Sequence, residues 1–377
     1  MDETDYGDLD MKLLINGMGT VGSRVAHLLL SMHVPIHGVK FSASKDDIKT
    51  QEILSLYQRF GAFPMLAAQG DNYDQRVQQF KAIGLHVEEK DIAQFPIVID
   101  GTDGDITQKN VEVYKKNDQR FLVQGGSDFE FAQKDFVSAP NSVGQTGEFP
   151  KARQVSCNTT FCSTALGLVL EEINDQSIAS VDVELHRRCR DPGEKKEMRE
   201  SLELKSSHHA EDIMSVLPQI QGKVTSKANI NAWEHFHHTQ LTVNFTKKVS
   251  AEKIAEHFKA YPRCIWVEPE LTQNPHTGMK IIMGVSSAMN VPDADTLLPI
   301  YSVHQLSDTS IMVRGFTPQR SVIALSCVDW LWMTANKIKR WKNAFDYTNK
   351  NAKWHGYSIA DLKRTYEEKV RVKVAAV

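Results

Sequence analysis

A glycine turn of the form Gly-x-Gly-x-x-Gly limits the folds open to this chain. It consists of Gly17, Gly19 and Gly22. An apolar run at 11–16 precedes it, and apolar residues spaced three to four positions apart follow it. Such glycines allow a tight turn and a close approach of the backbone to a diphosphate, and the helix N-terminus adds free N–H groups. The pattern predicts a dinucleotide site; the alternative is a glycine turn that binds nothing.

Strands and helices alternate through the first 150 residues. Short apolar strands are predicted at 35–40, 97–100 and 121–124, with helical stretches between them. Alternation of this kind predicts a doubly wound parallel sheet, as in a Rossmann domain.

The pattern changes after residue 157. A helix is predicted at 159–173, and strands with period-two alternation follow at 181–185 and 241–245. Such strands are typical of a largely antiparallel sheet with one solvated face. We therefore expect an α/β protein with a Rossmann doubly wound parallel sheet plus an α+β domain. From residue 318 to about residue 342 the chain is predicted to turn helical again and to pack back on the first domain.

Composition excludes several classes of protein. Forty-four basic and 47 acidic side chains give a net charge of −3, so we expect no nucleic acid and no membrane as partner. No apolar run approaches the roughly 18 residues that span a bilayer, and the acidic first residues are unlike a signal or transit peptide. The five cysteines are odd in number and scattered, so a cytoplasmic location is expected and a disulfide framework is not.

Cys157 stands where a predicted strand ends and a predicted helix begins. The amides and the dipole of a helix N-terminus stabilise a thiolate. Most free cysteines are buried and inert, but the Asn-Thr-Thr sequence that follows and the dinucleotide loop favour a reactive thiol. This pairing indicates oxidation of an aldehyde through a covalent thioester. Cys162, five residues on, is expected to turn away from Cys157 and to belong to the core.

Histidines gather downstream of the thiol, at 208–209 and 235–238. A metal site is one interpretation, but Cys or carboxylate partners at ligand spacing are missing, so we expect no metal. A general base for the proton of a thiol or a thiohemiacetal is the sharper interpretation. His235 and His237 share one face of a strand, so either could point into a cleft.

Basic residues stand at the ends of two predicted strands. The strand that contains Lys40 offers no acid until Asp46, although a carboxylate normally holds the ribose 2′-hydroxyl there. Lysine and serine would accept a 2′-phosphate, so Lys40 favours NADP or dual use unless it is a solvated surface lysine. Arg187 and Arg188 suit a phosphate or carboxylate group of a substrate, or alternatively a surface cluster of ion pairs.

Seven short motifs occur in a fixed order across residues 11–325. They lie at 15–22, 124–126, 155–160, 187–188, 191–192, 207–209 and 303–308. The ordered set resembles archaeal-type (type II) glyceraldehyde-3-phosphate dehydrogenase. Any one motif could arise by chance, whereas the set in this order is highly specific.

The resemblance implies a phosphorylating dehydrogenase of glycolysis or gluconeogenesis that uses glyceraldehyde 3-phosphate, inorganic phosphate and NADP or NAD, usually as a homotetramer. Cys157 would be the nucleophile, and a gap-free alignment makes His237 the catalytic base, with His235 as the alternative. The implied substrate-binding residues are Ser156, Asn158, Thr159, His208 and His209. Together with the three glycines and Lys40, the expected cofactor-binding residues are Thr20, Val21, Gly125, Arg188 and Gln305.

The strand and helix patterns described above divide the chain into the expected domains. They are a disordered extension at 1–10, an NAD(P)-binding Rossmann domain at 11–156, a catalytic and substrate domain at 157–304, and a C-terminal helical segment at 305–377 that returns to the Rossmann domain.

The chain departs from the family at three places near the expected substrate pocket. A charged stretch at 194–200 replaces Gly-Pro-Ile-Asn, Ala-Trp-Glu at 232–234 replaces Pro-Thr-Thr, and Leu306 replaces Glu. Two alternatives therefore stay open. One is a thiol-dependent dehydrogenase of another phosphorylated or carboxylated aldehyde, and the other is a weakly catalytic NAD(P)-binding regulatory protein.

Overall fold

The structure is a computed structural model of the 377-residue chain. It describes residues 11–41, 48–61, 63–67, 73–87, 91–102, 104–124, 134–143, 149–173, 177–189, 203–205, 207–231, 236–267, 298–317, 321–335, 338, 340–354, 357–358, 361, 363–365 and 367–368. The extension expected at 1–10 and the departures at 194–200 and 232–234 lie outside these residues.

The chain forms two compact units. The first combines Met1–Phe136, Thr146–Gln154 and Ala324–Ala344, and the second combines Val137–Gln145, Val155–Ile323 and Phe345–Val377. In the part of the chain that is described, no helix is long and apolar enough to cross a membrane.

The first unit contains a parallel sheet of seven strands in the order β3-β2-β1-β4-β5-β7-β6. The strands are β1 (Leu13–Asn16), β2 (Gly38–Phe41), β3 (Met65–Ala67), β4 (Ile97–Asp100), β5 (Arg120–Gln124), β6 (Lys134–Phe136) and β7 (Lys151–Gln154). The central strands β1 and β4 are buried on both faces, as parallel strands between helices are. The predicted doubly wound parallel sheet is confirmed.

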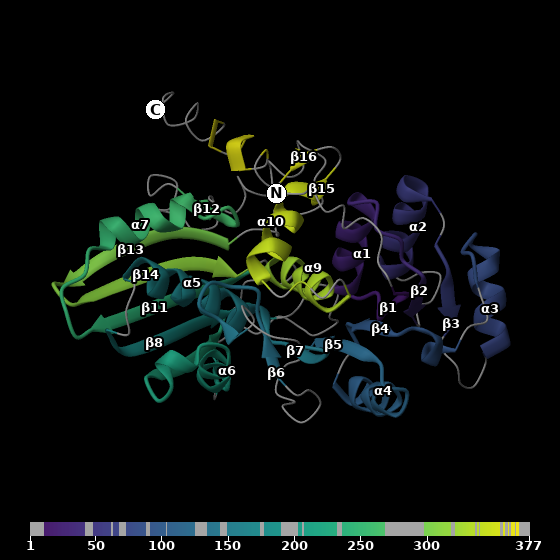
Figure 1. The fold of residues 1–377 in the computed structure, drawn as a ribbon, viewed down its shortest axis with the longest axis horizontal. Coiled ribbons are helices and arrows are strands. Elements are labelled where there is room, and N and C mark those ends of the chain that lie inside the picture. The colour runs from purple at the N-terminus through teal and green to yellow at the C-terminus, as the bar shows by residue number, and fades with distance from the viewer. Residues whose placement is uncertain are drawn as a thin grey trace. The chain divides into compact units, whose positions relative to one another are not determined.

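Helices cover both faces of this sheet. They are α1 (Gly22–Ser31), α2 (Ile48–Phe60), α3 (Tyr73–Ala82), the short η1 (Ile92–Gln94), α4 (Gly104–Lys116) and most of α9 (Ser321–Ala335). Parallel crossovers are right-handed, and the steps β1 to β2 and β4 to β5 run in opposite directions. Helices α1 and α4 therefore lie on opposite faces, as Figure 1 shows.

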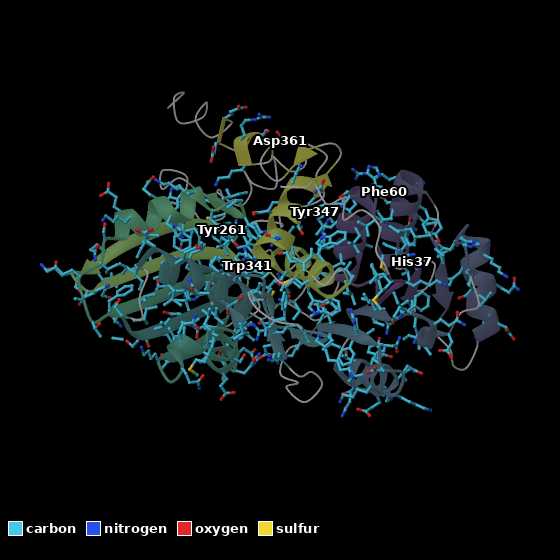
Figure 2. The ribbon with its side chains drawn as sticks, viewed as in Figure 1. His37, Phe60, Tyr261, Trp341, Tyr347 and Asp361 are labelled. Atoms are coloured by element: carbon cyan, nitrogen blue, oxygen red, sulfur yellow. The ribbon has the colours of Figure 1, made fainter. Side chains whose placement is uncertain are left out.

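Side chains of the first unit fix the ends of its elements. The N–H of Leu13 donates to Nδ1 of His37 at 3.3 Å, which ties the start of β1 to the chain before β2 (Figure 2). Phe60, at the end of α2, meets the ring of His27 edge to face with centroids 5.4 Å apart. On the other face, Tyr114 of α4 packs against Phe121 of β5 in an apolar cluster.

The second unit contains a mixed sheet in the order β12-β13-β14-β11-β8-β10-β9. Its strands are β8 (Ile178–Arg187), β9 (Glu203–Lys205), β10 (Val224–Ile230), β11 (His237–Phe245), β12 (Cys264–Trp266), β13 (Leu298–Ser307) and β14 (Ser310–Thr317). Only the pairs β12–β13 and β8–β10 are parallel among these described strands, so the sheet is largely antiparallel as expected. A separate hairpin joins β15 (Lys353–Trp354) and β16 (Tyr357–Ser358).

Three helices pack against one face of the mixed sheet (Figure 1). They are α5 (Cys157–Ile173), α6 (His209–Val216), which the short η4 (Pro218–Ile220) follows, and α7 (Ala251–Ala260). Along β11 every second residue, from His237 to Phe245, is buried, and the residues between are half-buried. This alternation places His237 on the face that the helices cover. At the end of α7, Tyr261 packs against Phe345 with ring centroids 5.5 Å apart (Figure 2).

The C-terminal region differs from its predicted secondary structure. The sequence assigned residues 310–317 to a C-terminal helical segment starting at 305. They form the strand β14 instead, in which the buried Ile311 and Val313 alternate with the half-buried Met312 and Arg314. The helix predicted from 318 to about 342 spans Ser321–Ala335 as α9, and a separate helix, α10 (Trp341–Asn351), follows it.

Candidate active site

Cys157 is the first residue of α5, and Ser156 caps that helix. The backbone N–H of Thr159 donates to Oγ of Ser156 at 3.2 Å, and the N–H of Thr160 donates to the Ser156 carbonyl at 2.8 Å. A serine side chain that accepts from the third helical N–H is an ordinary N-cap. The sequence therefore sets the thiol at a helix N-terminus, where free amides and the dipole favour a thiolate.

Cys157 is more exposed to solvent than the other four cysteines are. Its side chain is half-buried, whereas Cys162, Cys189, Cys264 and Cys327 are buried. Burial raises the pKa of the Cys162 thiol, and it raises the pKa of Cys264 and of Cys327 to about 12. The prediction that Cys162 belongs to the core is confirmed, since none of its surface is exposed.

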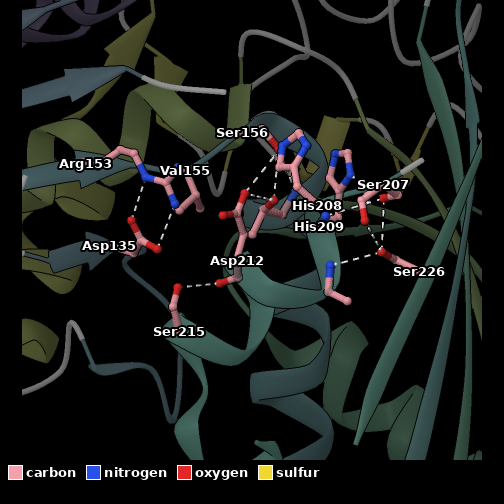
Figure 3. A network of polar contacts seen from close by, with 12 residues as sticks. Asp135, Arg153, Val155, Ser156, Ser207, His208, His209, Asp212, Ser215 and Ser226 are labelled. Atoms are coloured by element: carbon pink, nitrogen blue, oxygen red, sulfur yellow. Dashed lines mark hydrogen bonds and ion pairs between the residues drawn. The ribbon is translucent and has the colours of Figure 1, made fainter. Parts of the chain in front are cut away.

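The first turn of α5 is joined to α6 through a buried carboxylate. The hydroxyl of Thr159 donates to Oδ2 of Asp212 at 3.5 Å, and Nε2 of His208 lies 3.6 Å from the same oxygen. Asp212 has no exposed surface, while about a third of the His208 side chain is exposed. Figure 3 shows Asp212 beside His208. The helix that begins at Cys157 and the histidine pair His208 and His209 thus belong to one polar network.

His209 is held by serines rather than by a carboxylate. Its Nδ1 lies 2.7 Å from Oγ of Ser207, and Oγ of Ser226 in β10 donates to the same hydroxyl at 3.0 Å (Figure 3). The rings of His208 and His209 stack with centroids 4.6 Å apart. Burial, and then the charges of His208 and Arg187, lower the pKa of His209 to about 3. His209 is therefore neutral at physiological pH.

His237 begins β11 and is bonded to the end of β8. The backbone N–H of Arg188 donates to its Nδ1 at 3.1 Å. Burial, followed by the charges of Arg188, Arg187 and His209, holds the pKa of His237 well below its ordinary value. Because Nδ1 accepts, the neutral ring carries its hydrogen on Nε2. The ring at rest therefore presents a donor, whereas the sequence predicted a general base.

Basic groups gather near these histidines. Arg187 lies on the same sheet face as Leu185 and His237, and its charge acts on both His209 and His237. Within the described residues, Nε of Arg187 and the buried Oδ1 of Asn158 have no hydrogen-bond partner. Buried polar atoms normally have one, so Nε of Arg187 suits an anionic oxygen of a ligand and Oδ1 of Asn158 suits a donor such as a hydroxyl group.

The glycine turn of the first unit has the geometry that its spacing predicts. Gly17 has φ of +91°, and its N–H donates to the carbonyl of Lys40 at 2.8 Å. A Cβ on Gly22 would lie 1.9 Å from the Gly17 carbonyl oxygen, so the turn closes directly on the start of α1. A Cβ on Gly19 would meet nothing nearer than 4.0 Å. The space beside Gly19 is open, as close approach of a diphosphate requires.

The start of α1 fits an anionic group. Thr20 and Val21 lead into the helix, the first turn holds no acidic residue, and no side chain caps it. A diphosphate would satisfy these N–H groups and the dipole. The described residues of the turn thus fit a dinucleotide.

A buried network backs this turn. Asp100, at the end of β4, accepts from Tyr114 at 2.6 Å, from the hydroxyl of Thr102 at 2.6 Å, and from Asn110 at 3.0 Å. Asn16, at the end of β1, donates to Tyr114 at 2.7 Å and to Asp100 at 3.3 Å. Burial raises the pKa of Asp100 although the hydrogen bonds from Thr102, Tyr114 and Asn110 oppose the shift.

Lys40 is half-buried, so it is not a fully solvated surface lysine. Burial lowers the pKa of its ammonium, and the carboxylates of Asp100 and Asp91 oppose that shift. Its position at the end of β2, beside the glycine turn, is the place where the ribose of a bound dinucleotide is held. Two other candidates, Gly125 and His235, lie outside the described residues.

Gln305 is separated from the other candidates of the second unit. It pairs with Ile311 of β14, which lies opposite Val243 of β11. Val243 is six residues from His237 along β11, roughly 20 Å at about 3.4 Å per residue. The side-chain oxygen of Gln305 accepts from the N–H of Ala251 at 2.9 Å, at the start of α7.

Sequence reasoning did not single out Asp212 or Asp100. Asp212 follows His208 by four residues, a spacing that puts both on one side of a helix and could have revealed it. Asp100 ends an apolar strand and has no comparable signal. In the described residues no group of three His, Cys, Asp or Glu side chains could hold a metal ion.

The chain is similar to known proteins over both units. The family model described as glyceraldehyde 3-phosphate dehydrogenase, C-terminal domain, matches residues 156–309. A glyceraldehyde-3-phosphate dehydrogenase of Methanocaldococcus jannaschii is 32% identical over 270 residues, which are 69% of this chain and 75% of the relative. Relatives of the same name from Methanoregula boonei and Aeropyrum pernix are 30% and 28% identical, covering 67% and 72% of this chain and 71% and 75% of their own lengths.

Proposed function

Because this chain belongs to the glyceraldehyde-3-phosphate dehydrogenase family, we propose that it oxidises glyceraldehyde 3-phosphate to 1,3-bisphosphoglycerate with NADP or NAD and inorganic phosphate. The protein is an oxidoreductase by this membership. The observation that carries the proposal is the polar network that joins the helix of the Cys157 thiol to the histidine pair His208 and His209. Cys157 opens α5, and the first turn of the same helix shares the Asp212 carboxylate with His208.

The sulfur of Cys157 acts as nucleophile. The thiolate, favoured by the N-terminus of α5, adds to the aldehyde carbon and forms a carbon–sulfur bond, and the carbonyl oxygen becomes an alkoxide. Loss of hydride from that carbon leaves a thioester on Cys157. Inorganic phosphate then attacks the thioester carbon, the carbon–sulfur bond breaks, and the thiolate returns as the acyl phosphate leaves.

His237 handles the charge on the oxygen. Its Nε2–H can donate to the alkoxide, because Nδ1 is occupied by the N–H of Arg188. A neutral imidazole with a lowered pKa can polarise a carbonyl oxygen in this way without first losing a proton. Stabilisation of the developing oxyanion is the effect that accelerates addition of a thiolate.

The phosphate groups are assigned to the basic cluster. His208 and His209 lie at the start of α6, and Arg187 and Arg188 lie at the end of β8. Ser156, Asn158 and Thr159 surround the nucleophile in sequence and complete the proposed substrate site. Arginine and imidazole N–H groups give charge-assisted hydrogen bonds to phosphate oxygens.

A nicotinamide dinucleotide, when bound, would supply the hydride acceptor. Gly17, Gly19 and Gly22 leave room for its diphosphate, and the N–H groups of Thr20 and Val21 can bind the diphosphate oxygens. Lys40 lies near the end of β2, and its backbone carbonyl accepts from Gly17 of the glycine turn. This position supports contact of its ammonium with a 2′-phosphate and hence a preference for NADP over NAD.

Formation of the reduced cofactor tests the proposal. The protein is mixed with glyceraldehyde 3-phosphate and NAD or NADP, with and without inorganic phosphate, and near-ultraviolet absorbance is followed. Phosphate-dependent turnover is expected, faster with NADP. A single burst of one reduced cofactor per chain would restrict the function to acylation of the thiol, and no signal with either cofactor would refute the proposed substrate.

A further inference from the structure

We propose that Asp212 is the positioning residue that holds the phosphate-binding imidazole of His208 in place relative to the helix of the nucleophile. This inference rests on the proposed function for the identity of the substrate. One oxygen, Oδ2, faces both the hydroxyl of Thr159 and Nε2 of His208. Asp212 therefore links a residue two positions after Cys157 with a residue of the basic cluster (Figure 3).

Burial makes this carboxylate an unusual feature of the fold. Asp212 has no exposed surface, and a buried carboxylate is unfavourable unless it is paired and hydrogen-bonded. An acidic residue that only favoured the dipole of α6 would serve equally well at the surface, where the neighbouring Glu211 of the same turn lies. The burial of Asp212 between two helices indicates a role that depends on its partners.

The carboxylate also selects the orientation of the His208 ring. Nε2 of His208 lies 3.6 Å from Oδ2 of Asp212, an ion-pair distance without a hydrogen bond, and an ionised carboxylate favours a hydrogen on that nitrogen. Nδ1 can donate to a phosphate oxygen only in the ring that carries a hydrogen on both nitrogens. The adjacent ring of His209 stacks on His208 and restricts its rotation. Asp212 and the ring of His209 thus fix the place of the His208 imidazole, and the proposal assigns Nδ1 to the phosphate.

The effect of an Asp212 variant on phosphate binding distinguishes the positioning role from a purely structural role. Asp212→Asn keeps the shape of the side chain but replaces one accepting oxygen by a donating amide. Glu211→Gln makes the same chemical change at an exposed position one residue away and serves as the control. Three quantities are measured for each protein: the affinity for inorganic phosphate by calorimetry, and kcat/KM for glyceraldehyde 3-phosphate and for glyceraldehyde, which has no phosphate.

The expected result is selective. Asp212→Asn should weaken phosphate binding and lower kcat/KM for the phosphorylated aldehyde roughly ten-fold, chiefly through KM, because one charge-assisted contact is lost. The value for glyceraldehyde should stay within about two-fold of wild type, as should all three quantities in Glu211→Gln. Equal losses on both aldehydes, or no loss on either, would overturn the proposal.

A double-mutant cycle tests whether Asp212 acts through His208. In a His208→Asn background the further effect of Asp212→Asn on phosphate affinity should shrink to about two-fold, whereas independent roles would give additive effects. If Asp212→Asn does not fold, Thr159→Val removes the same link from the other side, and Thr159→Ser, which keeps the hydroxyl, is its control.

The proposal and the proposed function can fail separately. A wild-type protein that binds phosphate but reduces no cofactor with glyceraldehyde 3-phosphate would refute the function. A selective loss of phosphate affinity in Asp212→Asn would still support the positioning role. Absence of phosphate binding in the wild-type protein would overturn both.

Discussion

The backbone N–H of Arg188 donates to Nδ1 of His237 across the ends of strands β8 and β11, at 3.1 Å. A main-chain donor cannot become an acceptor, so this contact fixes one nitrogen of the ring as the accepting nitrogen whatever the Arg188 side chain does. The other nitrogen, Nε2, carries the hydrogen while the ring is neutral, and burial keeps the ring neutral. The strand pairing thereby determines which proton His237 offers to a ligand.

A glutamine should replace His237 better than an alanine does. The amide of His237→Gln can donate to an oxyanion but cannot take up a proton near neutral pH, whereas His237→Ala offers nothing. If donation is the role of His237, the glutamine variant should retain roughly ten-fold more kcat than the alanine variant. Steady-state rates at saturating substrate measure this ratio, and equal loss in both variants would indicate a base instead.

Cys157 should be the only thiol that reacts quickly. Iodoacetamide at neutral pH should label one cysteine per chain, because Cys157 is half-buried and the other four are buried. Cys157→Ser should show no fast labelling and no turnover but should bind the dinucleotide as the wild-type protein does. Mass spectrometry of the labelled peptide identifies the site; fast labelling of Cys162 would contradict the assigned burial.

Two glycines of the turn should respond differently to alanine. Gly19→Ala adds a Cβ in open space, so its melting temperature should not change while dinucleotide affinity falls, since the methyl group occupies the approach to the backbone. Gly22→Ala places a Cβ 1.9 Å from the Gly17 carbonyl, so it should lose about 1–3 kcal/mol of unfolding free energy. Thermal unfolding and fluorescence titration separate the two effects. Unchanged affinity in Gly19→Ala would argue that the turn binds no dinucleotide.

Lys40 should govern the choice between NADP and NAD. Lys40→Met should weaken NADP binding roughly ten-fold, because a charged contact to the 2′-phosphate is lost, and should leave NAD binding unchanged. Lys12→Met, at an exposed position before β1, is the matched control. Titrations with both cofactors measure the ratio of affinities. An equal loss of affinity for NADP and NAD would indicate that Lys40 supports the glycine turn instead.

Acid should destabilise the second unit through its buried histidines. Burial, with His186 and Arg314, lowers the pKa of His238 to about 4, against about 6.5 in an unfolded chain. Between these values the unfolded chain binds more protons than the folded one. The stability contributed by neutral His238 is therefore complete above pH 6.5 and is lost as the pH falls toward 4.

Urea unfolding between pH 4 and 7 gives the unfolding free energy at each pH and tests this prediction. His238→Gln should reduce the slope of unfolding free energy against pH by up to about 1.4 kcal/mol per pH unit. His33→Gln, at an exposed position, is the control and should leave the slope unchanged. An unaltered slope in His238→Gln would contradict the lowered pKa.

Local patterns were sufficient to predict the parts of the fold that depend on short-range chemistry. The run before Gly17 forms β1, and helices begin at Gly22 and at Cys157, because the glycine turn and the serine cap act within a few residues. The strand at 310–317 was missed because its apolar alternation is short and follows a tight turn after β13, where pairing with β11 decides the outcome.

In the candidate site, too, local sequence patterns predicted some features and tertiary contacts determined the others. Residues identified by motif, such as Cys157 and His208, occupy the ends of helices where sequence signals are strong. The four-residue spacing predicts that Asp212 lies beside His208, but its burial between α5 and α6 is a tertiary property that spacing does not report. The accepting role of Nδ1 in His237 likewise follows from the pairing of β8 with β11, a contact between residues 49 positions apart.

The alternation of β11 has a consequence for the register of this strand. His237 faces the helices and His238 faces away, so the two adjacent imidazoles differ only by strand parity. A slip of β11 by one residue against β8 and β14 would remove His237 from this face, bringing His238 there in one direction and Phe236 in the other. The same slip would turn Leu241 and Val243 away from the helices, so the apolar residues of β11 also fix which imidazole enters the site.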